Sequence, residues 1–251
     1  MGRVIAVANQ KGGVGKTTTC VNLCAALRQR GARTLLCDMD PQGNATSGIG
    51  VDKTKAEPNI YNVLIEGFDA EEAIVSTPYG DVLPSNKILA GAGVELVTTN
   101  NREFILKNAI AGLRDKYDYI LIDCPPSLEM LTMNSLCAAD TVLIPVQCEY
   151  YALEGLSDLM ATIKMIKKAL NPGLEIEGVL LTMYDSRTVF SAQVAAEIKR
   201  FFSRKVYNVS IPRNIRLAEA PSHGRPVTEY DASSRGSIAY KELAKEVMRS
   251  S

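Results

Sequence analysis

Residues 9–19 have the composition and spacing of a loop that binds a triphosphate. Glycine lacks a Cβ, so the backbone N–H groups of a glycine-rich turn can approach phosphate oxygens closely. A helix that begins near Lys16 would add its own N-terminal donors. We expect Lys16 to bridge the β- and γ-phosphates, Thr17 to bind Mg²⁺ through its hydroxyl, and Thr18 to donate to the α-phosphate. The residues expected to bind the nucleotide are Gln10, Lys11, Gly12, Gly13, Val14, Gly15, Lys16, Thr17 and Thr18.

Two acidic residues follow apolar runs and could complete this site. Asp40 comes shortly after the run at 34–37, and Asp123 directly follows Ile120-Leu121-Ile122. An acid at the carboxyl end of a parallel strand faces the ligand crevice of the sheet. We therefore expect Asp40 to position the attacking water and to support the Mg²⁺ shell, and Asp123 to hold Mg²⁺ through a water. An acidic turn that caps the next segment is the alternative for Asp40.

The elements that must position these residues alternate between short apolar runs and longer helical segments. Strands are expected at residues 4–8, 34–37, 119–122, 141–146, 176–183 and 205–211. Helices are expected at residues 16–30, 59–66, 103–114, 153–170, 188–202 and 235–249. This alternation predicts an α/β fold with a mostly parallel, twisted β-sheet and helices on both faces. No linker or repeat interrupts the pattern, so we expect a single domain over residues 1–251.

The composition restricts the partners that the chain can have. Its 251 residues include 28 basic and 28 acidic side chains, so DNA binding would need a local basic patch. The six cysteines form no C-x-x-C pair, and we expect them to be buried, reduced thiols. No apolar run reaches the roughly 18 residues that a membrane span needs. The sequence therefore predicts a cytoplasmic protein.

The phosphate loop departs from the usual G-x-x-x-x-G-K-[ST] pattern, because Gln10 replaces the first glycine and Lys11 adds a second lysine. In this it resembles the deviant Walker A family of P-loop ATPases, which includes the ParA/Soj partitioning proteins, MinD and the nitrogenase iron protein. Residues 38–48, 119–127, 145–156 and 211–224 also resemble chromosomal ParA/Soj proteins, most specifically in the segments 145–155 and 211–214.

This resemblance implies a P-loop NTPase-like fold, Mg-ATP as ligand and a homodimer that forms when ATP is bound. Lys11 would contact the γ-phosphate across the dimer interface, so Lys11, Lys16 and Asp40 form the expected catalytic set. Pro212 and Asn214 would lie against adenine, although Asn214 could instead be a turn or cap residue. No arginine finger is evident, so we expect slow hydrolysis without a stimulating partner.

A basic segment could supply the DNA-binding patch. Residues 186–225 contain eight basic residues and only two acidic ones, Glu197 and Glu219, an excess of six positive charges. Dimerisation would double this patch and so link ATP occupancy to DNA affinity. A solvated helix face with scattered charges is the alternative. The expected contacts with nonspecific double-stranded DNA are Arg187, Lys199, Arg200, Lys205 and Arg216.

The resemblance also implies a ParB-like, centromere-binding partner and association with the nucleoid. A MinD-like membrane protein is the main rival, and it would need an amphipathic C-terminal helix with bulky apolar residues. The tail at 239–251 instead alternates acids and bases, which favours packing on the domain and no membrane contact. A nitrogenase-type reductase would use Cys124 and Cys137, but their flanking residues do not resemble that family. A module that binds ATP without hydrolysis is disfavoured by Asp40.

Overall fold

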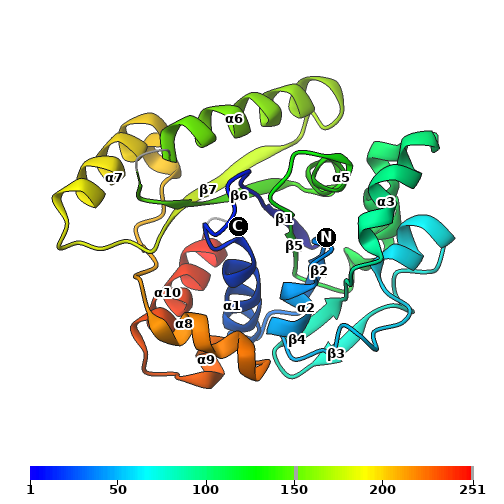
Figure 1. Cartoon of the computed structure of the whole chain (residues 1–251), viewed down its shortest axis with the longest axis horizontal. Coiled ribbons are helices and arrows are strands. Elements are labelled where there is room, and N and C mark those ends of the chain that lie inside the picture. The colour runs from blue at the N-terminus through cyan, green and yellow to red at the C-terminus, as the bar shows by residue number, and fades with distance from the viewer. Residues whose placement is uncertain (150–151, 250–251) are drawn as a thin grey trace.

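The computed structural model describes residues 1–149 and 152–249 (Figure 1). Tyr150 and Tyr151, which belong to the ParA/Soj-like segment 145–155, and Ser250 and Ser251 lie outside the described residues. A seven-stranded sheet with the strand order β3-β4-β2-β5-β1-β6-β7 organises the described part. Its strands are β1 (Arg3–Val7), β2 (Thr34–Asp38), β3 (Val75–Thr77), β4 (Gly80–Leu83), β5 (Tyr119–Asp123), β6 (Thr141–Gln147) and β7 (Glu175–Thr182). β3 is antiparallel to β4, and the other pairings are parallel, which confirms the predicted mostly parallel sheet.

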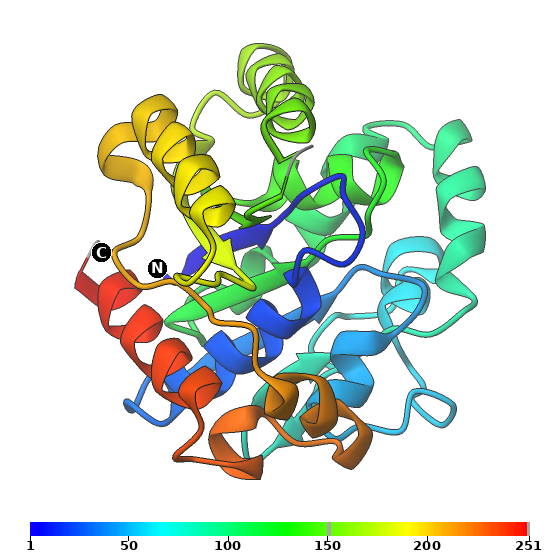
Figure 2. The same ribbon diagram turned by 60° about the vertical axis from the view of Figure 1, so that its left-hand side comes forward.

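Alternate residues of the strands pack into two apolar layers. In β1, Val4 and Ala6 belong to the layer that α3 to α7 cover, whereas Ile5 and Val7 belong to the layer under α1 and α10. Figures 1 and 2 show these two groups of helices on opposite faces of the sheet. The helices are α1 (Lys16–Arg28), α2 (Asn44–Gly48), α3 (Leu89–Glu95), α4 (Ile105–Ala109), α5 (Met130–Ala138), α6 (Ala152–Ala169), α7 (Val189–Phe202), α8 (Ile215–Glu219), α9 (Val227–Tyr230) and α10 (Arg235–Arg249).

The strand predicted at residues 205–211 is wrong. This segment runs beside β7 but makes only one isolated bridge there, from Val206 to Val179, within the described residues. The N–H groups of Asn208 and Val209 donate to the carboxylate of Glu246 on α10, at 2.9 and 2.8 Å. The N–H groups of Tyr207 and Ile211 still donate to β7, but Glu246 takes the N–H of Val209 between them, which interrupts the ladder.

Two helical predictions hold only in part. The helix expected at 59–66 is a single π-helical turn at Asn62–Glu66, and the one expected at 103–114 is α4 with a 3₁₀ turn on either side. All six cysteines are buried and unpaired, as expected. Within the described ranges, no helix combines the length and the apolar character that crossing a bilayer requires.

Candidate active site

The carboxyl ends of three neighbouring strands bring the predicted site residues together. Val7 at the end of β1 and Asp38 at the end of β2 are both in register with Asp123 at the end of β5. The glycine-rich loop leaves β1 at this edge, and α1 begins there at Lys16. A ligand at this edge would therefore meet the loop, the first turn of α1 and two strand-end carboxylates.

The loop owes its shape to two glycines with positive φ. Gly13 has φ of 76° and Gly15, the N-cap of α1, has φ of 91°, a region that residues with a Cβ rarely adopt. Asn9 fastens the loop to the sheet, since its Nδ2 donates to the carbonyl of Pro145 at 2.7 Å and its Oδ1 accepts from the N–H of Lys11 at 3.0 Å. A loop of this shape can present its backbone N–H groups to an anion.

Lys16 folds back over this loop. Its Nζ donates to the carbonyl oxygen of Lys11 at 3.1 Å, and only 7% of the residue is exposed. Burial lowers the pKa of Lys16, and the carboxylates of Asp123 and Asp40 oppose that shift. An ammonium group at the start of a helix, partly stripped of water, favours an anionic ligand that would restore its solvation.

Asp123 has the most exceptional environment of the acids. It is fully buried, and within residues 1–149 and 152–249 no hydrogen bond of ordinary geometry reaches either carboxylate oxygen, although the Thr17 hydroxyl lies close enough to lower the pKa of Asp123. Burial, and then the nearby Asp38, raises the pKa of Asp123, while Thr17 and Lys16 oppose the shift. A buried carboxylate without donors is costly unless a cation or an ordered water satisfies it. The arrangement fits a hydrated Mg²⁺ ion beside the Thr17 hydroxyl.

The chain supplies only part of such a metal shell. Residues 1–149 and 152–249 contain no cluster of three or more histidine, cysteine or acidic side chains that could hold a metal ion. Thr17 and Asp123 would therefore need oxygens from phosphates and water to complete an octahedral shell, which is how Mg²⁺ is commonly bound.

Asp40 lies at the rim of the site and Asp38 beneath it. Asp40 is 9% exposed, and its Oδ1 accepts from the N–H of Gln42 at 2.9 Å. Asp38 is fully buried, and burial raises its pKa to about 6. The hydrogen bonds from Thr46 and from the N–H of Asp40 lower that pKa and so offset part of the effect. Sequence reasoning gave Asp38 no role, although its place in an Asp-Met-Asp strand end was a usable signal.

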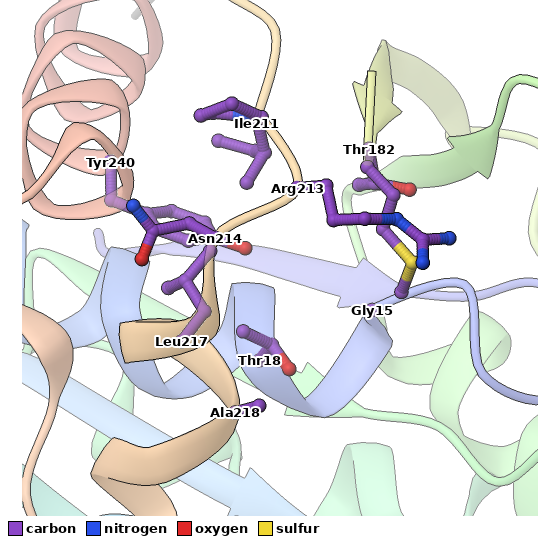
Figure 3. A pocket seen from close by; sticks show the side chains of 11 residues that line it. Gly15, Thr18, Thr182, Ile211, Arg213, Asn214, Leu217, Ala218 and Tyr240 are labelled. Atoms are coloured by element: carbon purple, nitrogen blue, oxygen red, sulfur yellow. The ribbon is translucent and has the colours of Figure 1, made fainter. Parts of the chain in front are cut away.

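A cavity of about 230 Å³ opens beside the loop (Figure 3). Both predicted base contacts, Pro212 and Asn214, line it. The Oδ1 of Asn214 caps α8 by accepting from the N–H of Arg216 at 2.9 Å, so Asn214 is a cap residue that also lines the cavity, and its contact with adenine stays a prediction. This bond uses the oxygen of Asn214 and leaves the amide nitrogen as the donor for a ligand. The other residues lining the cavity are Gly15, Thr18, Thr182, Met183, Ile211, Arg213, Leu217, Ala218 and Tyr240.

Lys11 is paired within its own chain. Its Nζ lies 2.7 Å from Oε1 of Glu149, and both side chains are more than a third exposed. The side chain is thus held near the mouth of the loop but not inside it. Sequence reasoning did not identify Glu149, because the two residues lie 138 positions apart.

The five predicted DNA contacts fall into two groups. Arg187 and Arg216 follow, by three and four residues, the two ends of the bridge between Tyr184 and Pro212. The second group is at the other end of α7, where Lys199 and Arg200 belong to its last turn and Lys205 to the 3₁₀ turn that follows. Figures 1 and 2 both show α7 and α8 apart.

Acidic neighbours offset part of the positive charge. Arg187 pairs with Asp185 at 2.7 Å, and Arg216 pairs with Glu219 at 2.8 Å and with Asp231 at 3.2 Å. Asp185 and Asp231 lie just outside the segment 186–225, so they were not counted in the predicted excess of six positive charges. The net positive charge around Arg187 and Arg216 is therefore smaller than the sequence count suggests. Arg213 was not among the five contacts, yet it lies close enough to Asp185 to lower the pKa of that acid.

Comparison with known proteins gives full-length similarities. A family model described as an AAA domain matches residues 2–176. The sporulation initiation inhibitor protein Soj of Bacillus subtilis (strain 168) is 56% identical over 249 residues, covering 98% of each chain. The chromosome partitioning protein ParA of Myxococcus xanthus (strain DK1622) is 51% identical over 251 residues, covering 99% of this chain and 89% of that protein.

A solved structure extends the similarity to three dimensions. The crystal structure of cobyrinic acid a,c-diamide synthase from Mycobacterium smegmatis, with bound ADP and magnesium, has a TM-score of 0.87 and 40% sequence identity. The match covers 99% of this chain and 95% of that one. Its identity is lower than that of the Soj and ParA proteins above.

Proposed function

Because the chain belongs to the ParA and Soj family of chromosome-partitioning ATPases, we propose that it is a DNA-partitioning switch that binds and slowly hydrolyses Mg-ATP. The observation that carries this proposal is the pairing of a glycine loop with two incompletely solvated charges. Lys16 is a buried cation over the loop, and Asp123 is a buried carboxylate whose two oxygens lack a well-formed hydrogen bond within the described residues. A triphosphate with its Mg²⁺ ion would satisfy both.

In this proposal the loop backbone and the side chains of Lys16, Thr17 and Thr18 bind different parts of the Mg-ATP ligand. The N–H groups of residues 10–15 surround the β-phosphate, and Lys16 lies between the β- and γ-phosphates. Thr17 and Asp123 would hold a hydrated Mg²⁺ ion, which would neutralise charge that develops on the phosphate oxygens. Thr18 donates to the α-phosphate, which directs the base toward the cavity lined by Pro212 and Asn214.

Asp40 acts on the attacking water. Its Oδ1 is held by Gln42, and within the described part of the chain its Oδ2 accepts no hydrogen bond, so Oδ2 can orient a water toward the γ-phosphorus. The water adds to phosphorus as the bond to the bridging oxygen breaks, giving ADP and phosphate. Positioning alone gives a modest rate, which agrees with a slow basal ATPase that needs a ParB-like stimulator.

Dimer formation would complete the site with Lys11 of a second subunit. The ion pair with Glu149 keeps this side chain on its own subunit, so Lys11 must leave Glu149 to reach a γ-phosphate across an interface. An exposed ion pair contributes only about 1 kcal/mol or less. A triphosphate therefore competes easily for Lys11, and ATP favours the dimer.

Gly12→Val is expected to separate ATP binding from dimer formation. A Cβ at Gly12 would meet nothing within 4 Å in its own chain, so the substitution should leave the loop in place. The affinity for Mg-ATP should change by less than about threefold. A valine on the outer lip would collide with a second subunit. Size-exclusion chromatography with light scattering, run with Mg-ATP, should find wild-type dimers and Gly12→Val monomers. A dimeric variant would contradict an interface at this lip.

The dimer would then hold DNA by charge rather than by sequence. Two copies of the basic groups around Arg187 and around Lys199 would act together, so ATP-driven pairing raises DNA affinity through avidity. The bound dimer would lie on the nucleoid until a ParB-like protein stimulates hydrolysis and release.

Nucleotide-dependent DNA binding tests this function. Fluorescence anisotropy with two unrelated duplexes should detect binding with Mg-ATP, little binding with Mg-ADP or without nucleotide, and equal affinity for both duplexes. Raising the salt concentration should weaken the binding, because phosphate contacts release counterions. Equal binding in all three nucleotide states would contradict the switch. Vesicle sedimentation is the matching test for the MinD-like alternative.

The C-terminal helix argues against that alternative. Its apolar residues Tyr240, Leu243 and Val247 are at most 1% exposed and pack under the sheet with α1. The hydroxyl of Tyr240 also lies 3.2 Å from that of Thr19 on α1. A helix used in this way would have to leave its place before it could enter a bilayer surface.

A further inference from the structure

A closed ring of hydrogen bonds lies beneath Asp40. Asp38 accepts from the Oγ1 of Thr46 at 2.7 Å and from the N–H of Thr46 at 2.8 Å, both through its Oδ2. The Oγ1 of Thr46 accepts from the N–H of Ser85 at 2.9 Å. The Oγ of Ser85 donates to the carbonyl of Asp40 at 2.8 Å, and the N–H of Asp40 returns to Oδ1 of Asp38 at 3.2 Å.

The ring joins three separate pieces of the fold. Asp38 ends β2, Thr46 lies in α2, and Ser85 follows β4. All three residues are completely buried. Buried polar groups that satisfy one another fully make a rigid network, because no water can replace a lost partner.

Both main-chain groups of Asp40 are members of the ring. Its N–H and its carbonyl are each bonded to a buried side chain, so the Asp40 backbone has little freedom to rotate. Gly43 brings the next turn close, since a Cβ there would lie 2.6 Å from the carbonyl oxygen of Ser85. The buried side chains of Asp38 and Ser85 therefore fix the backbone of Asp40, and with it the direction of its carboxylate.

We propose that Asp38, Thr46 and Ser85 are positioning residues that orient Asp40 for hydrolysis of ATP, acting on the rate of the chemical step and not on nucleotide affinity. This inference rests on the proposed function, because it assumes that Asp40 orients the attacking water. In the described part of the chain, no hydrogen bond joins Asp38, Thr46 or Ser85 to residues 9–18, and none of the three lines the base cavity. Small displacements of a water-orienting group reduce the reaction rate, whereas the affinity for the nucleotide comes from other residues.

Ser85→Ala tests this with little change in volume. Single-turnover hydrolysis of γ-labelled ATP should slow by about tenfold, comparable to the loss of one well-formed hydrogen bond to a positioned group. The affinity for Mg-ATP, measured by calorimetry, should stay within about twofold. Ser135→Ala is the matched control, because Ser135 is also fully buried and its hydroxyl donates to a main-chain carbonyl, that of Leu131, at 2.8 Å.

A second pair of variants guards against a general loss of stability. Thr46→Val keeps the side-chain volume but removes the hydroxyl, whereas Thr46→Ser keeps the hydroxyl and removes a methyl group. A positioning role predicts slow hydrolysis for Thr46→Val and near-normal hydrolysis for Thr46→Ser. A packing role predicts the reverse order, because the serine leaves a cavity.

The outcomes separate this inference from the function beneath it. Hydrolysis by Ser85→Ala at the wild-type rate would overturn the inference, and so would a parallel fall in rate and affinity. Loss of rate alone, with the Ser135→Ala control unaffected, would support it. If the wild-type protein itself bound no Mg-ATP, the proposed function would fail instead.

Discussion

Lys16→Ala is expected to lose Mg-ATP binding by at least about 100-fold, as judged from the value of charge-assisted hydrogen bonds in a water-poor site. The Lys16 ammonium lies over the phosphate loop, donates to its backbone and is only 7% exposed. Lys11, the other lysine of the loop, instead directs its ammonium group to Glu149. Isothermal titration calorimetry with Mg-ATP measures the loss directly.

The same variant should remain folded. Burial lowers the pKa of Lys16, which means that the fold bears a cost for keeping its charge. Removing that charge should leave the thermal midpoint unchanged or raise it. Lys55→Ala is a suitable control, since Lys55 is exposed and pairs with Asp52 on the surface. Tight Mg-ATP binding by Lys16→Ala would show that the triphosphate lies elsewhere.

Asp40→Ala is expected to slow hydrolysis by at least about 100-fold, within the range for removal of a group that handles the attacking water. Nucleotide binding should persist, because Lys16, Thr17 and Asp123 keep their contacts. The variant should therefore accumulate as an ATP dimer that stays on DNA. A single-turnover assay gives the rate, and DNA co-sedimentation with Mg-ATP gives the trapped fraction.

Two results would contradict this role. Release of DNA by Asp40→Ala in the presence of ATP would mean that Asp40 builds the dimer instead of limiting its lifetime. Loss of ATP affinity would mean that Asp40 is chiefly a metal-site residue. Asp69→Ala, a change in an exposed turn far along the chain, should behave like the wild-type protein in both assays.

The parts of the fold that the sequence predicted well are those with long local patterns. β1, the glycine loop and α1 combine an apolar run, left-handed glycines and a helix start, so local residues determine each element. The hairpin of β3 and β4 was missed because its strands have only three and four residues around Pro78-Tyr79-Gly80, which is typical of a turn. The strand predicted at 205–211 does not form because Glu246 accepts hydrogen bonds from the backbone of this segment. No local pattern reveals that partner.

For the candidate site too, the sequence predicted the features that local residues determine and missed the contacts between distant elements. Backbone donors of a loop follow from glycine spacing, and strand-end acids follow from apolar runs. The ring through Thr46 and Ser85 could not be predicted, because its residues come from three elements whose packing decides their contact. The acidic residues Asp185 and Asp231, which offset positive charge of the basic segment 186–225, were also missed because they lie just beyond its ends.

The contact between Lys11 and Glu149 bears on the kinetics of the proposed cycle. Exposed side chains exchange rotamers in roughly nanoseconds, so freeing this lysine cannot set the pace of a slow ATPase. When Lys11 leaves Glu149 for a phosphate of another subunit, one anion replaces another and few counterions move. The ionic-strength dependence of the whole cycle should consequently come from its nucleic-acid step, while subunit pairing stays comparatively indifferent to added salt.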